Sequence, residues 1–474
     1  MSPTFADLVA AGPASIITLS ALVVITIEAL KDKSESLTSV LTIVGFVAAI
    51  AAASADLGTT GTAFGGMVTT GGYANFFAIV FSLAGVLSVM LSRSYIITQE
   101  IEHGEYYALL LIAVLGMIFM ASAADLIVFF LGLEMMSISF YILAGFLRTR
   151  TTSNEAALKY FLLGAFATGF LLYGIALIYG STGTTDIETI LTGASLSMGK
   201  TTFVIGLGLV LIGLMFKIAA VPFHMWVPDV YEGSPTTVSG FMSTGGKAAA
   251  FSAILIIFAP RLTGLADGVR EILAVLAALS MIVGNVIAIA QTNLKRMLAY
   301  SSIAHAGYML TGVVAANAAG SNGVMFYLLA YTMMNIGAFG VLSMLEARDG
   351  SNLVFDDYAG LSTKRPFLAG LMALFMFSLT GIPPFAGFFG KYYVFVGAVE
   401  AGYTWLAILG VLMSVVSAYY YLRLVVLMYF KEQVSTLDSR ASKLGVAALV
   451  ASAAALVVLG LFPSSVLTIT AHFF

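Results

Sequence analysis

The sequence predicts an all-α polytopic membrane protein with about fourteen transmembrane helices. Composition gives the first indication, because 60% of the 474 residues are hydrophobic and only 9% are charged. The mean hydropathy of +1.01 lies far above that of a soluble domain. The second indication is a series of apolar runs of about 20 residues, the length that crosses a bilayer. Most connections between the runs are short, so no soluble domain is expected.

The apolar runs follow one another along the whole chain. They centre near Val23, Val44, Leu83, Ile112, Leu131, Leu171, Val210, Leu255, Ala278, Met309, Ala330, Phe377, Val411 and Val457. The longer connections include the Gly/Thr-rich "DLGTTGTAFGGMVTTGG" and the segment "STGTTDIETILTGASLSMGK". No basic stretch precedes the first run, so we expect a retained span and not a cleaved signal peptide.

Basic residues are the third indication, because they favour alternate loops. The odd-numbered loops hold thirteen of them, Lys31, Lys33, Arg93, Arg148, Arg150, Lys295, Arg296, Arg348, Lys364, Arg365, Lys431, Arg440 and Lys443, and the even-numbered loops hold three, Lys200, Arg261 and Arg270. Cytoplasmic loops are enriched in Lys and Arg. The bias therefore predicts a multi-pass protein of the cell (inner) membrane, with an even number of spans and both termini on the non-cytoplasmic side.

An internal repeat is indicated by two similar motifs. "KIAAVPFHMW" in the seventh run and "LTGIPPFAGFFGKYYVF" in the twelfth each place a Pro-Phe break in an apolar helix beside a lysine. A repeat of five helices must be inverted across the membrane, which indicates a transport pathway between paired broken helices. We therefore expect a three-helix segment at residues 1–104, a five-helix repeat at 105–260, an inverted second repeat at 261–432 and a C-terminal helix at 433–474.

Five ionisable residues lie inside apolar runs: Glu134, Lys217, Lys247, His305 and Lys391. A charge at mid-bilayer costs at least about 2.5–3.5 kcal/mol, so such residues are functional by default. Because burial disfavours the charged forms of lysine and glutamate, a partner that approaches or leaves can make them gain or release a proton. They are therefore candidate proton-transfer groups. A packing role is the alternative for Glu134, and a structural role is as plausible as a relay role for His305 and for His224 at the first break.

The prolines at the two breaks lie close in sequence to two of these lysines. Pro222 and Pro228, and likewise Pro383 and Pro384, lack a backbone N–H and leave carbonyls that water or neighbouring protein must satisfy. A hydrated break beside a buried lysine is a plausible proton route, although isolated proline kinks in membrane helices are commonly structural.

The chain contains no cysteine. Cysteine-ligated iron–sulfur clusters, thiolate-bound haem and disulfides are therefore excluded. Any electrons must travel in another chain, and we expect no metal site and no bound cofactor in this one.

Taken together, Glu134, Lys217, the block "VPFHMWVPDVYEGSPT", Lys247 and "LTGIPPFAGFFGKYYVF" closely resemble the antiporter-like membrane subunits of respiratory complex I, the NADH:quinone oxidoreductase. The resemblance covers nearly the whole chain and is greatest to the subunit N type. The M type is expected to carry a glutamate at the position of Lys391, and the L type extends into a lateral helix, whereas this chain stops at "TAHFF". Multisubunit sodium–proton antiporters share much of the pattern and stay an alternative.

The resemblance implies fourteen helices, two inverted five-helix repeats and breaks in helices 7 and 12. It implies that Glu134 and Lys217 form a switching pair, that Lys247 is the central proton carrier, and that Lys391 leads to the exit. The two histidines become candidates for the connecting polar chain. Quinone, FMN and iron–sulfur clusters are expected in partner subunits, with no redox cofactor in this chain.

The sequence thus favours a proton-translocating subunit of a quinone-reducing complex. Its expected partners are other antiporter-like and small membrane subunits, the lipid bilayer and, indirectly, a hydrophilic redox arm, with no nucleic acid. Two alternatives stay open. One is a cation/proton antiporter that works without redox input, and the other is a structural spacer with an inactive channel, which the full set of buried charges disfavours.

Overall fold

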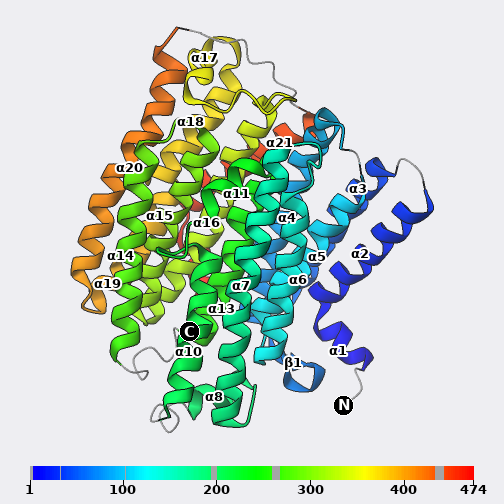
Figure 1. Ribbon diagram of the computed structural model, residues 1–474, viewed down its shortest axis with the longest axis vertical. Coiled ribbons are helices and arrows are strands. Elements are labelled where there is room, and N and C mark those ends of the chain that lie inside the picture. The colour runs from blue at the N-terminus through cyan, green and yellow to red at the C-terminus, as the bar shows by residue number, and fades with distance from the viewer. Residues whose placement is uncertain are drawn as a thin grey trace.

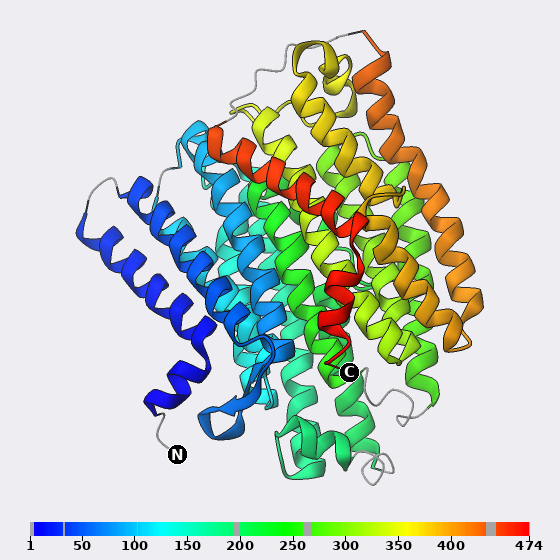
Figure 2. The same ribbon diagram turned by 180° about the vertical axis from the view of Figure 1, so that it is seen from behind.

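The computed structural model describes residues 4–31, 34–101, 103–193, 200–258, 267–432 and 442–473. Helices stand side by side in one bundle, with α2 and α3 at one edge and α20 at the opposite edge (Figure 1). On the reverse side, α21 lies tilted across the bundle (Figure 2). The prediction of an all-α polytopic fold is confirmed.

Twelve helices among the described residues are long and apolar enough to cross a membrane. They are α2 (Gly12–Leu30), α3 (Glu35–Ala55), α4 (Gly72–Gln99), α5 (Glu105–Ser122), α6 (Leu126–Ala144), α7 (Thr151–Thr182), α10 (Thr201–Ile218), the continuous helix Thr236–Ile257, α14 (Asp267–Ile289), α16 (Ala318–Leu345), α20 (Thr404–Phe430) and α21 (Lys443–Leu461). The tenth predicted run is α15 (Leu294–Ala315), and the twelfth is divided between α18 (Pro366–Thr380) and α19 (Ala386–Glu400). These helices account for the fourteen predicted runs.

The continuous helix Thr236–Ile257 changes its winding in the middle. It begins as α12 (Thr236–Phe241), passes through a π-helical turn at Met242–Gly246, and continues as α13 (Lys247–Ile257). A π turn inserts one extra residue per turn and is frequent at functional sites. Here it immediately precedes Lys247.

Short elements connect the spans. They are α1 (Phe5–Ala10), the 3₁₀ turns Phe64–Gly66 and Phe355–Tyr358, α8 (Ile187–Thr192), α11 (Val227–Gly233), α17 (Leu361–Lys364) and α22 (Ser464–Thr470). The Gly/Thr-rich connection forms an antiparallel hairpin of β1 (Thr60–Ala63) and β2 (Val68–Gly71), with Thr60 opposite Gly71. Sequence analysis treated this segment only as a connection. The turn is possible because Gly65 and Gly66 both have positive φ.

Both predicted helix breaks are present, and they begin in the same way. The last helical residues of α10 and α18 are followed by left-handed residues, Ala219 (φ 62°) and Gly381 (φ 90°). The next residue in each case bonds back to the helix: Ala220 N to Met215 O at 2.9 Å, and Ile382 N to Phe377 O at 3.1 Å. Each helix therefore ends in a Schellman-type cap.

The chain resumes a helix after each break. Pro222 lies within the first break and Pro228 in the first turn of α11, while Pro383 and Pro384 lie between α18 and α19. The two broken helices occupy equivalent places in two groups of five, α5 to α13 and α14 to α20. An odd number of helices per group makes the second group inverted relative to the first.

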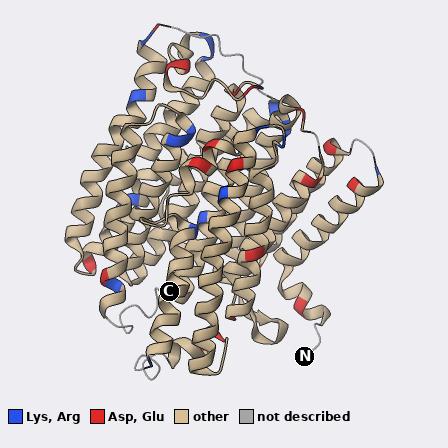
Figure 3. Ribbon diagram, viewed as in Figure 1, with Lys and Arg blue, Asp and Glu red and all other residues tan. Residues whose placement is uncertain are grey.

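Charged residues gather towards the two ends of the bundle, and few lie in its middle (Figure 3). Lys33, Arg261 and Arg440, three of the basic residues used to predict orientation, lie outside the described residues. The side of the membrane that each terminus faces stays a prediction.

The helix that carries Glu134 is fixed at its start and along one face. Asp125 precedes α6, and its Oδ1 accepts a hydrogen bond from Ile127 N at 2.7 Å, which caps the helix. Further along, Gly132 of α6 packs against Gly116 of α5, where a Cβ on Gly116 would lie 2.5 Å from Gly132 O. Close backbone packing of this kind is typical of membrane helices.

Candidate functional site

Lys217 lies in the last turn of α10 and is 7% exposed. Its Nζ donates a hydrogen bond to Ser137 Oγ on α6 at 2.7 Å. The rings of Tyr141 and Tyr160 flank the amine, with their centres 5.6 and 5.9 Å from Nζ. The amine is therefore held by one neutral hydroxyl and two aromatic faces.

Glu134 lies on α6 three residues before Ser137, so the two side chains share a helix face. Its Oε1 is buried and has no hydrogen-bond partner among the described residues. Within that part of the chain, no ion pair joins it to Lys217. The structure thus places the predicted switching pair on neighbouring helices, with Lys217 bonded to Ser137 and not to the carboxylate.

Lys247 follows the π turn and is 2% exposed. Its Nζ donates to Ser302 Oγ on α15 at 2.6 Å and also to the backbone oxygen of Ser302. The ring centre of Tyr331, from α16, lies 5.8 Å from Nζ. This lysine is therefore bound by neutral oxygen atoms at the junction of three helices.

His305 lies on α15, one turn beyond Ser302, and is buried. Its Nδ1 is 2.7 Å from Tyr327 Oη and its Nε2 is 3.1 Å from Tyr421 Oη. Tyr421 Oη is also hydrogen-bonded to Ser301 Oγ. The histidine thus belongs to a chain of hydroxyl groups that begins next to the residue that binds Lys247.

Lys391 lies on α19 and is 5% exposed. Its Nζ donates to the backbone oxygens of Thr380, at 2.8 Å, and Leu379, at 3.2 Å, at the end of α18. The ring of Tyr308 lies 4.8 Å from Nζ and 5.6 Å from the ring of His305. Tyr308 therefore stands between the histidine and the last lysine.

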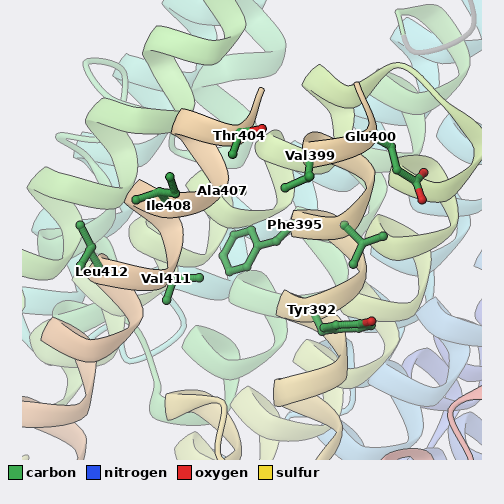
Figure 4. Close-up of a pocket in the computed structure, with 10 residues that line it drawn as sticks. Tyr392, Phe395, Val399, Glu400, Thr404, Ala407, Ile408, Val411 and Leu412 are labelled. Carbon is green, nitrogen blue, oxygen red and sulfur yellow. The ribbon is translucent and has the colours of Figure 1, made fainter. Parts of the chain in front are cut away.

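Two cavities follow the groove between α19 and α20. Lys391 lines one of about 360 Å³, and the other, of about 500 Å³, is walled by apolar side chains. Phe395 of α19 and Val411 of α20 point towards each other across the larger one (Figure 4). The side chains in these walls that can exchange a proton are Lys391 in the smaller cavity, Glu400 in the larger one, and Tyr392 in both.

His224 lies in the first break and stays outside the hydrogen-bonded chain. It is partly buried, and its Nδ1 is buried without a partner among the described residues. Its backbone oxygen accepts a hydrogen bond from Val227 N at 3.0 Å, near the start of α11. The structure brings Lys247, His305 and Lys391 into one series of contacts and leaves His224 apart from them.

Sequence analysis missed the uncharged members of the site. Ser137, Ser301, Ser302, Tyr308, Tyr327 and Tyr421 all contact a predicted residue or its neighbour. The spacing of "YSSIAHAGY" contained a signal, because residues three, four and seven apart line one helix face. Tyr327 and Tyr421 belong to other apolar runs, and nothing in their sequence positions indicated that they would contact His305.

A second polar cluster lies where α16 ends. Glu346 Oε1 pairs with Arg150 Nη1 at 3.0 Å, and its Oε2 accepts from Thr236 Oγ1 at 2.5 Å. Lys295, one of the basic residues used to predict orientation, is 1% exposed and donates to Ser234 O at 2.6 Å. Within the described residues, no group of three or more His, Cys, Asp or Glu side chains is arranged to hold a metal ion.

Comparison with known proteins agrees with this geometry. A family model described as NADH:quinone oxidoreductase/Mrp antiporter, TM, matches residues 123–417. NADH-quinone oxidoreductase subunit N of Trichlorobacter lovleyi is 51% identical over 443 residues, which cover 92% of this chain and 90% of that protein. Subunit N 1 of Chloroherpeton thalassium is 46% identical, with 95% of each chain covered.

Solved structures give the same result. A chain of respiratory complex I from Thermus thermophilus with bound aureothin is 37% identical and superposes with a TM-score of 0.84, covering 97% of this chain and 99% of that one. A chain of the Mrp complex from Dietzia sp. is 21% identical, with a TM-score of 0.89 and coverage of 99% and 97%, and shows the fold alone. The predicted resemblance is confirmed, and the chain belongs to the family of NADH:quinone oxidoreductase and Mrp antiporter membrane subunits, among the subunit N relatives.

Proposed function

We propose that this chain is a proton-translocating membrane subunit of a complex I-type NADH:quinone oxidoreductase. The observation that carries the proposal is the series of contacts from Lys247 through Ser302, Ser301, Tyr421, His305 and Tyr308 to Lys391. Hydroxyl and imidazole groups can accept a proton on one side and release one on the other. The relatives named subunit N of NADH-quinone oxidoreductase support the same conclusion.

In the proposed mechanism, the switch consists of Lys217, Ser137 and Glu134. Lys217 is bonded to Ser137, and the carboxylate of Glu134 lies one turn away on the same helix face. A shift of the amine from Ser137 to Glu134 would close an ion pair and neutralise the positive charge of Lys217 on α10, a helix that packs against α13, which carries Lys247. The opposite shift would restore that charge and drive the proton of Lys247 onward, because like charges repel strongly in a low dielectric.

The residues from Lys247 to Lys391 supply the proton path and its terminal acceptor. A proton that leaves Lys247 Nζ would enter at Ser302 Oγ, and from the adjacent Ser301 hydrogen bonds continue through Tyr421 to His305. Ring contacts join His305, Tyr308 and Lys391 and fix their order, without themselves carrying a proton. Lys391 is the terminal acceptor. The carbonyls of Leu379 and Thr380 at the C-terminal end of α18, which carry partial negative charge, accept hydrogen bonds from its amine.

Energy for the switch would come from other chains. We place quinone, FMN and the iron–sulfur clusters in partner subunits, and assign none to this chain. Its direct partners would be antiporter-like and small membrane subunits within the cell inner membrane, with a hydrophilic redox arm acting through them. Both termini would face away from the cytoplasm, and the boundaries at residues 104, 260 and 432 would separate the helix groups.

Proton pumping by the assembled complex in membrane vesicles tests the proposal. Lys247→Ala and Glu134→Ala should assemble and lose most of their pumping, since each removes a group that holds a proton or controls one. Lys364→Ala, an exposed lysine near the end of α17, is the matched control and should pump normally. Wild-type stoichiometry in both test variants would overturn the mechanism.

A cation/proton antiporter is the second candidate, because the superposition on the Mrp chain has a TM-score of 0.89. The subunits that purify with the chain distinguish the two. Iron–sulfur subunits support redox-driven pumping, whereas small membrane subunits alone, together with sodium–proton exchange driven by an ion gradient, support antiport. Pumping that survives removal of the charge at all four of Glu134, Lys217, Lys247 and Lys391 would indicate a structural spacer.

A further inference from the structure

Asn335 is a fully buried amide on α16 that the proton path described above does not use. Its Nδ2 donates to Ser243 Oγ at 2.6 Å and to Tyr331 Oη at 3.0 Å. Ser243 lies in the π turn before Lys247, and the ring of Tyr331 lies beside the Lys247 amine. Both partners of the amide are therefore immediate neighbours of the central lysine.

The direction of these hydrogen bonds is fixed by chemistry. Ser243 Oγ donates its hydrogen to Gly240 O at 2.8 Å, so towards Asn335 it can only accept. With the hydroxyl hydrogen on Gly240 O, the amide group facing Ser243 is the NH₂, and the carbonyl Oδ1 faces away from Ser243. Oδ1 is buried and has no partner among the described residues.

An unpaired buried carbonyl oxygen destabilises a protein, so packing alone does not account for an asparagine here. Leucine has nearly the same size and would remove that cost. The helices are also brought unusually close at this point: a Cβ on Gly240 of α12 would lie 3.0 Å from Phe339 Cβ, one turn beyond Asn335. This close approach allows the amide to reach the π turn.

We propose that Asn335 is a positioning residue for Lys247, which it aims at Ser302 by holding Ser243 of the π turn and the hydroxyl of Tyr331. A π turn rotates the residues that follow it relative to a regular helix. The amide bond to Ser243 secures this turn from α16, and Tyr331 contacts both Lys247 and the ring of His305, whose centre is 5.1 Å away. This inference rests on the proposed proton-transfer function.

The test compares pumping with stability in the assembled complex. Asn335→Leu should retain or raise the Tm, because an unpaired polar atom is removed. It should lower the proton-pumping rate about two- to tenfold, the range expected from losing one net hydrogen bond, and it should change the pH profile of pumping. A purely structural residue would change Tm and leave that profile unaltered.

Two further variants make the result specific. Ser243→Ala, which keeps the bond from Asn335 to Tyr331, should lower pumping by no more than Asn335→Leu does. The double variant should lose little more than Asn335→Leu alone, because that change has already removed the contact with Ser243. Thr332→Val is the matched control on the same helix: among the described residues its buried hydroxyl bonds only to Leu328 O, and pumping should not change.

Lys247→Ala in the same vesicles distinguishes a failure of the proposed function from a failure of the positioning role of Asn335. If it pumps normally, the proposed function fails. If Lys247→Ala stops pumping while Asn335→Leu pumps at the wild-type rate with the wild-type pH profile, only the positioning role of Asn335 is overturned. Additive losses in the double variant would also overturn it.

Discussion

The two broken helices begin alike and hold their lysines differently. In both, the first half ends in a left-handed residue and the same backwards hydrogen bond. In the first, Lys217 precedes the break and reaches a neighbouring helix through Ser137. In the second, Lys391 follows the break and reaches back to the carbonyls of Thr380 and Leu379.

The partners of the two lysines differ in how easily they can be exchanged. A serine hydroxyl on another helix is one acceptor, and the carboxylate of Glu134 stands on the same face as its competitor. The carbonyls at the end of α18 belong to the break itself and have no competing carboxylate among the described ion pairs. Under the proposed function, the same motif would serve as a switch in the first repeat and as a fixed cation site in the second.

The largest expected effect comes from replacing each lysine by methionine. Both variants should lose most of their pumping. Lys391→Met should also unfold more easily, by about 1–3 kcal/mol, because two helix-end carbonyls lose their donor. Lys217→Met should keep its stability, because Ser137 Oγ still donates to Leu133 O at 2.5 Å. Thermal unfolding of the purified complex measures the difference.

The cost of burying one charge cancels when the Tm values of the two lysine variants are compared. Each change relieves the cost of one buried charge, so a difference in Tm reports on what the amine held in place. The exposed Lys431→Met serves as the control and should alter neither pumping nor Tm. Equal losses of stability at both sites would contradict a capping role that is particular to Lys391.

A smaller effect is expected from the serines that bind the lysines. Ser137→Ala removes the only hydrogen-bond acceptor of Lys217 among the described residues, and the amine should move to Glu134, lowering the pumping rate about tenfold. Ser302→Ala leaves Lys247 its bond to the Ser302 backbone oxygen but removes the hydroxyl at which the proposed path begins, so a loss of about tenfold or more is expected.

Pumping in vesicles ranks these variants. Ser139→Ala is the matched control, because its hydroxyl lies on α6 and, within the part of the chain that the structure describes, bonds only to Met135 O. Wild-type pumping in Ser137→Ala would contradict the assignment of the switch to the first repeat, and wild-type pumping in Ser302→Ala would contradict proton entry at Ser302 Oγ.

The fold was largely predictable because its strongest signals are local. Runs of about 20 apolar residues and two proline breaks give the helices, and the five-helix interval gives the repeat. The hairpin at β1 and β2 was not predicted, since four-residue strands rich in threonine and glycine look like a loop. Its pairing of Thr60 with Gly71 is a contact between segments, which a hydropathy pattern does not contain.

The site was predictable only in its charged members. Glu134 and the three lysines stand out because charges are rare in apolar runs. Serines and tyrosines cost little to bury in a helix, so Ser302 and Tyr421 look like their neighbours until α15 and α20 are packed together. For the same reason, sequence suggested a Glu134–Lys217 pair but could not show that a serine one turn away competes for the amine.

The smallest expected effect concerns the second halves of the two broken helices. α11 is anchored by Asp229, which pairs with Lys159 at 2.6 Å and Arg296 at 2.9 Å, and by Glu232, which pairs with Arg296 at 2.7 Å. No ion pair involves α19 among the described residues. Asp229→Asn should therefore lower the Tm slightly at low salt, whereas Glu400→Gln on α19 should not.

The salt dependence of the Tm tests whether charge anchors α11. The Asp229 side chain is 38% exposed, and ion pairs that water reaches contribute about 1 kcal/mol or less. At about 1 M salt the screening length falls to roughly 3 Å, so the difference between Asp229→Asn and the unmodified complex should shrink towards zero. A difference that persists at high salt would mean that hydrogen-bond geometry, which asparagine cannot reproduce towards both cations, anchors α11. The second halves of the two broken helices would then differ in hydrogen-bond geometry and not in charge.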